Sequence, residues 1–315
     1  MDKKFRVLVT GGCGFIGSHI AEKMADAGYD VVIFDDLSSG TMENITHLSG
    51  RVKFFRGDVR NKKELRGALS GAGVVFHEAA FVSVPESEKD PSRCFDINLG
   101  GTISLLEEAE RAGVEKVIFA SSCAVYGNNE DLPLTENAGV SPGSPYAVSK
   151  SVAEQLMKEY CVRRPISITA LRYFNVYGPR QNPESKYAAV VSKFIQDGGK
   201  KRKLSVEGDG SQTRDFIFVG DVAEANMRAA QASLKGFHAI NVCSGKEASV
   251  MDLAKNMSLL IGNVSIEQAP PRANDIARSW GSGEKALDLL GFSPKTSLIE
   301  GLKITVESYL ERKLR

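Results

Sequence analysis

The sequence predicts an α/β protein with a doubly wound parallel sheet, and three observations support this fold class. Short apolar runs rich in Val, Ile and Phe recur from the start of the chain, as in strands that are buried on both faces. Amphipathic stretches separate these runs, and strand–helix alternation gives a parallel sheet with helices on both faces. The rhythm changes after about residue 175, which predicts a second and smaller lobe.

The expected elements follow one another in chain order. Six strands are expected in the first part of the chain, at 5–10, 31–36, 52–55, 74–80, 116–122 and 166–174. Helices are expected between them, at 15–27, 61–69, 92–112 and 145–163. A loop with Pro and Gly at 178–185 comes next, and further helices are expected near 187–197 and 220–232. One more strand, at 237–243, is expected to rejoin the main sheet, and a small helical cap that ends at 298–313 completes the chain.

These elements predict two interwoven domains. Residues 1–175 would form a dinucleotide-binding domain, to which residues 215–243 would return. Residues 176–214 and 244–315 would form a smaller, mostly helical lobe. The sequence has no internal repeat, low-complexity tract or free linker. The second lobe is therefore expected to be interwoven with the first rather than joined to it by a flexible linker.

Composition narrows the possible partners and the compartment. The chain is 42% hydrophobic and 25% charged, with a net charge of +1. This balance gives no electrostatic reason to expect nucleic acid or an anionic membrane as a partner. The only dense basic run, Lys200–Lys203, is expected to be a solvated loop face. The N-terminal apolar run is too short for a signal peptide or a membrane span, which predicts a cytoplasmic protein.

Cysteine and histidine usage predicts neither disulfides nor a metal. The five cysteines are an odd number and contain no C-x-x-C, and the four histidines do not occur at metal-ligand spacing. A disulfide framework and a zinc site are therefore both unexpected.

The first strand runs into the glycine-rich segment TGGCGFIGSH, in which Gly11 or Gly12 is followed by Gly14 and Gly17 at dinucleotide-binding spacing. Glycines permit the tight turn and the close approach of a pyrophosphate, and the following helix offers N–H groups and a positive dipole. Asp35 ends the second strand, 18 residues after Gly17. A carboxylate there would bind the adenosine ribose and repel a 2′-phosphate, which favours NAD over NADP.

Two other strand ends suit the same cofactor. Asp58 closes the third strand, where it could accept a hydrogen bond from the adenine amino group. Ala79 and Ala80 close the fourth strand, and their small side chains would let the chain pass over the cofactor. His77, beside them, is better explained as a packed strand-end histidine than as a catalytic group.

The segment SPYAVSK sets Tyr146 and Lys150 four residues apart at the start of a predicted helix. The phenol and the ammonium therefore project from one face. Taken alone, the pair is more often an ordinary feature of an amphipathic helix than a catalytic one. Its meaning depends on the rest of the sequence.

Seven segments in chain order together resemble one family: TGGCGFIGSH, HEAAFVSVPES, NLGGT, SSCAVYG, SPYAVSK, LRYFNVYGPRQ and GDGSQTRDFIFVGDV. They resemble the NAD-dependent nucleotide-sugar epimerases and dehydratases, the extended branch of the short-chain dehydrogenases/reductases. The resemblance covers essentially the whole chain. It implies a Rossmann-type sheet, tightly bound NAD, a UDP-sugar substrate, and a homodimer through a four-helix bundle made by helices 92–112 and 145–163.

The resemblance also implies the site residues. The catalytic residues would be Ser122, Tyr146 and Lys150. The cofactor would contact Gly11, Gly14, Phe15, Ile16, Gly17, Asp35, Asp36, Ser38, Ser39, Gly40, Asp58, Val59, Ala79, Ala80, Asn98, Ser121, Tyr146, Lys150, Tyr173 and Val176. The substrate would contact Ser83, Ser122, Tyr146, Asn175, Arg214, Arg272, Asp275 and Ser279.

Physical chemistry is consistent with the implied catalytic roles. A phenol ordinarily has a pKa near 10, and a lysine cation together with the nicotinamide ring would lower it. Lys150 could also bond the nicotinamide ribose. Ser122, at the C-terminal end of the fifth strand, could bond the reacting sugar hydroxyl.

The two residues that follow Ser122 indicate the type of reaction. The 4,6-dehydratases carry Asp and Glu there and UDP-glucuronate decarboxylases carry Glu, whereas this chain has Cys123 and Ala124. Neither can act as the acid or base of an elimination. The resemblance then implies 4-epimerisation: Tyr146 takes the proton of the 4-hydroxyl, C4 gives hydride to NAD, and the keto sugar turns over before the hydride returns.

The resemblance further implies how the substrate is held. Asn175, Arg214 and Arg272 would bind the diphosphate and ribose, and guanidinium groups suit phosphate oxygens. Asp275 would accept from the nucleotide ribose. A small residue at the position of Ser279 resembles enzymes that admit N-acetylated sugars, which predicts activity on UDP-GlcNAc/UDP-GalNAc alongside or instead of UDP-glucose/UDP-galactose.

Alternatives stay open at this point. Trp280 or Arg278 could fill the space beside Ser279. Val82 and Ser83 replace the lysine-containing segment of bacterial glucose-type epimerases, which leaves the nicotinamide ribose contacts there open. A UDP-glucuronate 4-epimerase would need a cation near the sugar C6, for which Lys186 is the candidate. A non-catalytic NAD-sensing protein on this fold would tend to lose the Tyr/Lys pair.

Overall fold

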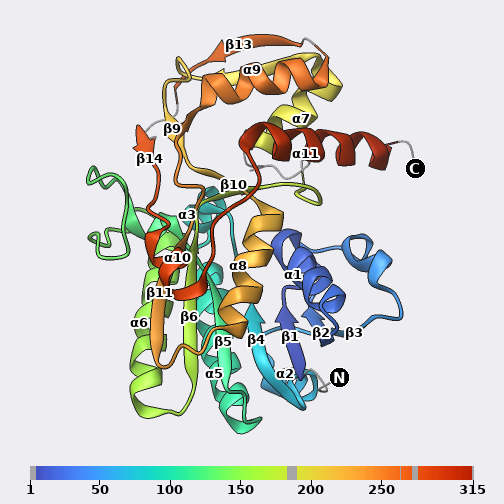
Figure 1. Cartoon of the computed structure of the whole chain (residues 1–315), viewed down its shortest axis with the longest axis vertical. Coiled ribbons are helices and arrows are strands. Elements are labelled where there is room, and N and C mark those ends of the chain that lie inside the picture. The colour runs from blue at the N-terminus through green and yellow to red at the C-terminus, as the bar shows by residue number, and fades with distance from the viewer. Residues whose placement is uncertain (1–4, 183–189, 263, 272–275, 314–315) are drawn as a thin grey trace.

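The computed structural model describes residues 5–182, 190–262, 264–271 and 276–313 (Figure 1). Its core is a seven-stranded parallel sheet in the order β11-β6-β5-β4-β1-β2-β3. The strands are β1 (Arg6–Thr10), β2 (Asp30–Asp35), β3 (Val52–Arg56), β4 (Ala72–His77), β5 (Lys116–Ser122), β6 (Ser167–Tyr173) and β11 (Phe237–Val242). The predicted fold class is confirmed, and the late strand rejoins the sheet beside β6 as expected.

Helices cover both faces of this sheet, and each face has its own apolar core. Side chains alternate between the two cores along a strand, so Val7 and Val9 of β1 face one and Leu8 faces the other. The first core lies under α1 (Phe15–Asp26), α8 (Val219–Gln231) and α10 (Glu284–Leu290). The second lies under α2 (Lys62–Leu69), α5 (Gly101–Arg111) and α6 (Pro145–Arg163).

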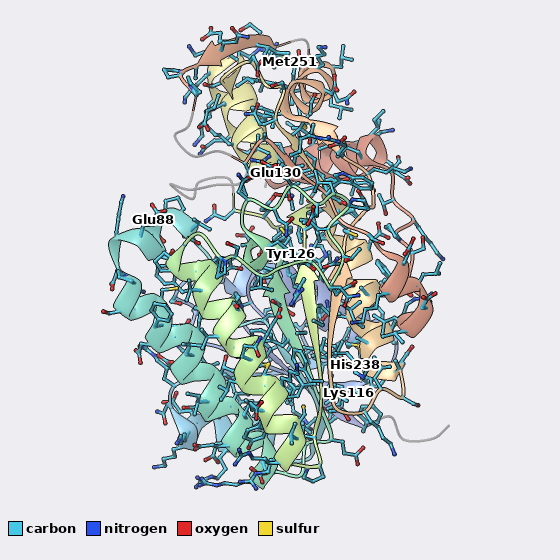
Figure 2. All side chains as sticks on the ribbon, turned by 90° about the vertical axis from the view of Figure 1, so that its left-hand side faces the viewer. Glu88, Lys116, Tyr126, Glu130, His238 and Met251 are labelled. Atoms are coloured by element: carbon cyan, nitrogen blue, oxygen red, sulfur yellow. The ribbon has the colours of Figure 1, made fainter. Side chains whose placement is uncertain are left out.

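The direction of the strand order reverses between β1 and β4. From β1 the chain moves outward to β2 and β3, and it then returns to build β4, β5, β6 and β11 on the other side. In such sheets ligands bind beyond the carboxyl ends of the strands at this switch point. Figure 2 places Lys116, at the start of β5, near the lower end of the sheet and Tyr126, just past the end of β5, near the upper end. The second lobe sits above that upper edge (Figure 1).

The predicted helix at 92–112 is not one regular helix. It consists of α4 (Pro91–Phe95), a π-helical turn labelled η2 (Asp96–Gly100) and α5, and it is preceded by α3 (Val84–Lys89). Asp90 separates α3 from α4 because its side chain accepts from the N–H of Arg93 and Pro91 takes the first helical position. The π turn carries Asn98 into the protein interior, and this kind of insertion is common at functional sites.

The second lobe packs α7 (Val190–Lys201), α9 (Val250–Ile261) and α11 (Leu298–Lys313) around an apolar core of its own. It also contains small sheets that the sequence did not predict. They pair β7 (Asn175–Tyr177) with β10 (Phe216–Phe218), β8 (Lys203–Glu207) with β13 (Ser265–Ala269), and β9 (Thr213–Arg214) with β12 (Ala248–Ser249) and β14 (Arg278–Ser279). The expectation of a mostly helical lobe was therefore incomplete. Five of these strands have only two or three residues, which is too short to show a periodicity, and β8 and β13 have five residues each. The domain boundaries themselves stay a prediction.

The basic run Lys200–Lys203 spans the end of α7 and the first residue of β8. Lys201 pairs with Asp197 one turn earlier, and Lys203 pairs with Glu267 on the neighbouring strand. Arg202 donates to the carbonyl of Gly262. The lysines are exposed as expected, but the expectation of a loop is corrected, because the run ends a helix and begins a strand.

Three properties of the described ranges bear on partners and cofactors. All five cysteines are free thiols. Within these ranges, no three His, Cys, Asp or Glu side chains are grouped so that they could hold a metal ion. No helix there has the length and apolar character needed to cross a membrane.

Candidate active site

The glycine-rich turn between β1 and α1 leaves room only for backbone. Gly11 has a φ of +66°, and a Cβ on it would lie 2.7 Å from the amide nitrogen of Ala79. A Cβ on Gly17 would lie 2.2 Å from the carbonyl oxygen of Gly11. Helix α1 begins at Phe15, so the N–H groups of its first turn have no partner within the helix. This cradle at a helix N-terminus fits the pyrophosphate of a dinucleotide.

Gly17→Ala is expected to destabilise the protein by about 3 kcal/mol, because the new methyl group would overlap the Gly11 carbonyl. The purified variant should also have lost its cofactor. Thermal unfolding and the nucleotide content of the purified protein measure both effects.

Gly67→Ala is the matched control for this substitution. Nothing lies within 4 Å of a Cβ at Gly67, in the exposed middle of α2. The control should be stabilised by about 0.5–1 kcal/mol and keep its cofactor. A Gly17→Ala variant with wild-type melting and cofactor content would contradict the role assigned to the turn.

The segment after β2 closes over this turn. The buried carboxylate of Asp35 accepts from the N–H of Cys13 at 2.9 Å and from that of Leu37 at 2.8 Å. Burial raises the pKa of Asp35, and these two hydrogen bonds oppose the rise. A carboxylate has acceptor sites beyond these two, so Asp35 can still bind a ribose hydroxyl. A Cβ on Gly40 would lie 2.7 Å from the carbonyl carbon of Cys13, so the segment passes directly over the turn.

The other residues predicted on this segment lie nearer the surface. Asp36, Ser38 and Ser39 are exposed, and the Asp36 carboxylate accepts from the N–H of Ser38. They form the outer rim beside the buried Asp35.

Asp58, beyond the end of β3, has a protein partner that the sequence did not suggest. Its carboxylate accepts from Nε of Arg60 at 3.0 Å, and Arg60 also pairs with Asp96. Hydrogen bonds from Arg60 lower the pKa of Asp58. Val59, beside it, is buried against Gly101 and belongs to the second core of the sheet.

His77 is a structural residue, as expected. Its Nδ1 lies 2.8 Å from Oγ1 of Thr10, and its Nε2 lies 3.0 Å from Oγ1 of Thr102. The Thr102 hydroxyl donates to the carbonyl of Asn98, so Nε2 of the histidine carries the proton and donates to Thr102. Burial lowers the pKa of His77 to about 3, and the ring stays neutral. The chain of bonds ties β1 and β4 to the π turn.

Ala79 and Ala80 follow this histidine at the switch point. The N–H of Ala79 donates to the Thr10 hydroxyl at 3.3 Å, and Ala79 also limits the space beside Gly11. Both alanines are partly exposed at the carboxyl end of β4. The chain therefore passes close to the glycine turn, and the expected passage over the cofactor stays a prediction.

Asn98 holds the loop after β4 against α6. Its Oδ1 accepts from the N–H of Phe81 at 2.7 Å, and its Nδ2 donates to the Phe81 carbonyl at 3.1 Å and to Oγ of Ser149 at 2.8 Å. Both amide hydrogens are thus taken by protein groups. The side chain of Asn98 therefore positions neighbouring segments, and the cofactor contact expected of this residue stays a prediction.

Helix α6 presents the tyrosine and the lysine to the end of β5. Ser144 caps the helix by accepting from the N–H of Ala147 at 3.2 Å, and the N–H of Tyr146 donates to Oγ of Ser87 at 3.2 Å. Nζ of Lys150 donates to the carbonyl of Ala120 on β5 at 2.7 Å. Ser122 lies beside the phenol of Tyr146, and its hydroxyl acts to lower the pKa of that phenol. The three predicted catalytic residues therefore meet at the carboxyl end of β5.

In the protein alone, the pKa of this phenol lies above its ordinary value. Burial raises the pKa of Tyr146 to about 12, and the Ser122 hydroxyl opposes the rise only in part. Burial also lowers the pKa of Lys150 to about 8. The Lys150 Nζ lies 5.9 Å from the centre of the Tyr146 ring and is bonded to backbone. The lowering of the phenol pKa that was expected from Lys150 together with the nicotinamide ring stays a prediction.

A buried ion pair lies behind the catalytic residues. Glu154, one turn after Lys150 on α6, accepts from Nε and Nη2 of Arg172 at 3.0 and 2.6 Å. The side chains of both residues are only 6% exposed. The hydroxyl of Ser121 donates to Glu154 at 2.5 Å, and the cofactor contact expected of Ser121 stays a prediction. Arg172 also donates to the hydroxyl of Tyr126 at 2.9 Å.

Glu78 is a second group that the sequence did not identify. The hydroxyl of Tyr173, at the end of β6, donates to Oε1 of Glu78 at 2.9 Å. Nδ2 of Asn226 on α8 donates to the same hydroxyl at 2.8 Å. Burial raises the pKa of Glu78 to about 7. Tyr173 was a predicted cofactor contact, and this network fixes its ring on the α8 side of the sheet.

The predicted substrate residues lie where the second lobe meets the sheet. Asn175 begins β7, directly after β6, and its Nδ2 donates to the carbonyl of Asp215 at 2.9 Å. Val176, a predicted cofactor contact, is the middle residue of the same strand. Arg214 on β9 donates to the carbonyl of Ile276 at 2.6 Å. Ser83 caps α3 by accepting from the N–H of Glu86.

Ser279, the small residue predicted to admit N-acetylated sugars, lies beside one of these substrate candidates. Ser279 is buried on β14 and lies opposite Arg214 in the short parallel pair. Arg278 is bound to the exposed Glu247 by an ion pair of 2.6 Å, so it does not fill the space beside Ser279. Nε1 of Trp280 is buried without a hydrogen-bond partner among the described residues. Two further predicted contacts, Arg272 and Asp275, lie outside the described residues, as does Lys186.

Comparison with known proteins identifies the family. The sequence profile of the NAD dependent epimerase/dehydratase family matches residues 7–243, which is more than half of the chain. The chain belongs to this family. The NAD dependence of the family agrees with the glycine cradle and with the carboxylate at the end of β2.

Individual members are similar over nearly the whole chain. The UDP-glucose 4-epimerase of Mycolicibacterium smegmatis is 37% identical over 96% of this chain and 98% of its own. A structure of the UDP-N-acetylglucosamine 4-epimerase of Methanobrevibacter ruminantium M1 with UDP-N-acetylmuramic acid is 36% identical, with a TM-score of 0.94 and coverage of 98% and 99%. A structure of the Thermotoga maritima UDP-glucose 4-epimerase with UDP-glucose is 35% identical, with a TM-score of 0.92 and coverage of 98% and 100%.

Proposed function

We propose that this enzyme is a UDP-hexose 4-epimerase with tightly bound NAD, acting on UDP-glucose/UDP-galactose and on UDP-GlcNAc/UDP-GalNAc. The observation that carries the proposal is the meeting of Ser122, Tyr146 and Lys150 at the carboxyl end of β5, on the same edge of the sheet as the glycine turn after β1. Relatives that are 4-epimerases of UDP-glucose and of UDP-N-acetylglucosamine support it.

The residues after Ser122 favour epimerisation over elimination. Cys123 and Ala124 occupy the short 3₁₀ turn that follows β5. Burial, with the charge of Asp215, raises the pKa of the Cys123 thiol to about 12. A thiol of that pKa is no base at neutral pH, and the alanine has no proton to give. The site therefore supports oxidation and reduction at one sugar carbon better than the removal of water.

Each catalytic residue has a task that its position supports. Tyr146 is placed to take and return the proton of the sugar 4-hydroxyl, and Ser122 to hold that hydroxyl. Lys150 is anchored on the Ala120 carbonyl with its remaining N–H bonds available to a ribose. Bound NAD supplies the hydride acceptor for C4 and a positive ring charge that favours the phenolate.

The test is conversion of two nucleotide sugars without added cofactor. Purified protein is incubated with UDP-glucose and, separately, with UDP-GlcNAc, and each sugar is then separated from its 4-epimer. The proposal expects both to reach a mixture of epimers. No conversion of either, even with NAD supplied, would reject the UDP-hexose assignment.

Ser279→Tyr is expected to narrow the specificity. A bulky ring at this buried position would occupy space that we assign to the sugar C2 substituent. Activity on UDP-GlcNAc should fall by about 10- to 200-fold relative to UDP-glucose, as for other steric changes in a pocket. The ratio of kcat/KM for the two sugars measures this. An unchanged ratio would show that Ser279 does not face the C2 substituent.

The same experiments distinguish two alternative functions from the proposed one. A UDP-glucuronate 4-epimerase would convert UDP-glucuronate in the same assay and leave the two hexoses unchanged. A non-catalytic NAD-sensing protein would convert none of the three sugars, and Tyr146→Phe would leave its function intact.

We also propose a homodimer through α5 and α6. Ile103 and Val152 on these helices are 42% and 43% exposed, although both are apolar. A second copy packed against them would bury both side chains. Sedimentation at micromolar concentration should give twice the mass of the chain.

A further inference from the structure

Asp215 connects the strands that carry the predicted substrate residues. It lies between β9 and β10 and is completely buried. Its backbone carbonyl accepts from both the N–H and the Nδ2 of Asn175, at 3.0 and 2.9 Å. Its backbone N–H donates to the carbonyl of Ser279 at 2.9 Å. Arg214 directly precedes it.

The carboxylate of Asp215 holds two further segments. Oδ1 accepts from the N–H of Ser244 at 2.7 Å, and Oδ2 accepts from the N–H of Gly245 at 3.0 Å and of Gly281 at 3.4 Å. The turn at 244–245 follows β11 of the main sheet, and Gly281 lies two residues beyond Ser279. One buried carboxylate therefore connects the turn after β11 of the main sheet to the segment that follows β14 in the second lobe.

Burying a carboxylate without a cation is costly unless several donors surround it. Three of the donors are backbone N–H groups, whose positions are fixed by the chain on either side of them. Such an arrangement fixes the relative position of the segments that supply the donors. The three residues proposed to bind the nucleotide sugar adjoin Asp215. Arg214 precedes it in the chain, and Asn175 and Ser279 are hydrogen-bonded to its backbone.

We propose that Asp215 is a positioning residue for nucleotide-sugar binding, which sets the places of Asn175, Arg214 and Ser279 before the substrate arrives. The proposal rests on the proposed function. Ser122, Tyr146 and Lys150 are held instead by β5 and by the first turns of α6. Loss of the carboxylate should therefore weaken substrate binding and leave the chemical step nearly unchanged.

The test is Asp215→Asn, compared with Asp221→Asn. Asparagine has a single acceptor oxygen, so in either orientation its amide group faces at least one N–H that has lost its acceptor. Asp221 is the matched control: it is also buried, and its two oxygens accept from the N–H groups of Lys295 and Thr296 at 3.1 and 3.0 Å. Both variants lose comparable bonds, but only one touches the proposed substrate segments.

For Asp215→Asn we expect KM for UDP-glucose and the Kd for UDP to rise about tenfold, with kcat within about twofold of wild type and the cofactor retained. Asp221→Asn should lower the melting temperature similarly and leave KM and Kd within about twofold. Unchanged KM and Kd in Asp215→Asn, or an equal rise in both variants, would overturn the proposal.

Two further arms keep the test decisive. If Asp215→Asn fails to fold, Asp215→Glu keeps the charge and displaces both oxygens by one methylene, and the same weakening of KM and Kd is expected. If wild-type protein converts neither sugar, the proposed function fails. The Kd for UDP then still tests Asp215, because it requires no turnover.

Discussion

Tyr146→Phe should lower kcat for UDP-glucose epimerisation by about 10²- to 10⁴-fold, because the variant has no group to take the proton from the 4-hydroxyl. The ring itself should stay in place. Its backbone N–H is bonded to Ser87, and the helix cap at Ser144 does not involve the phenol. Initial rates of epimer formation measure the loss, and the nucleotide content of the purified variant shows whether NAD is still bound.

Tyr160→Phe is the control for this substitution. It removes a phenol hydroxyl from the same helix, but one that lies away from the end of β5. The Tyr160 hydroxyl is hydrogen-bonded to the Leu106 carbonyl and to Glu110. We expect its kcat within about twofold of wild type and a stability loss of about 1 kcal/mol. If Tyr146→Phe kept more than about a tenth of wild-type kcat, Tyr146 would not be the proton-transferring group.

The largest effect on stability is expected from Arg172→Met. The substitution leaves Glu154 buried with one hydroxyl donor, Ser121, in place of a bidentate guanidinium. Breaking a buried pair from one side costs about 3–5 kcal/mol, since the remaining charge is uncompensated. The free energy of unfolding from urea melts should fall by that amount.

A double variant and an exposed pair complete this experiment. Arg172→Met combined with Glu154→Leu removes both charges and should recover most of the lost stability. Lys203→Met breaks an ion pair whose side chains are 45% and 54% exposed, and it should cost less than about 1 kcal/mol. Equal losses for Arg172→Met and Lys203→Met would mean that the buried pair contributes no more than a surface pair.

The main sheet could be predicted because its strands are continuous apolar runs. Each of the six expected early strands, and the late strand at 237–242, forms in the sheet with ends shifted by a few residues at most. The glycine turn, Asp35 and the Ser122–Tyr146–Lys150 group could likewise be predicted, because each is a local pattern tied to a strand or helix end. Family resemblance supplied the roles that spacing alone left open.

The polar network behind the site could not be predicted. Arg172 and Glu154 lie 18 residues apart in sequence on a strand and a helix, and nothing local marks them as a pair. Glu78 and Asp215 each resemble an ordinary acidic residue until distant segments supply their hydrogen-bond donors. The same reason explains why the hydrogen bonds of Asn98 to Ser149 and of Ser121 to Glu154 could not be predicted.

The most direct measurement follows the hydrogen at C4. UDP-glucose that carries deuterium at C4 is incubated with the purified protein in ordinary water without added NAD, and the UDP-galactose formed is examined by mass spectrometry and NMR. Transient oxidation by retained cofactor predicts that the product keeps its deuterium at C4. Product that carries hydrogen there, or no product at all, would contradict the proposed 4-epimerase.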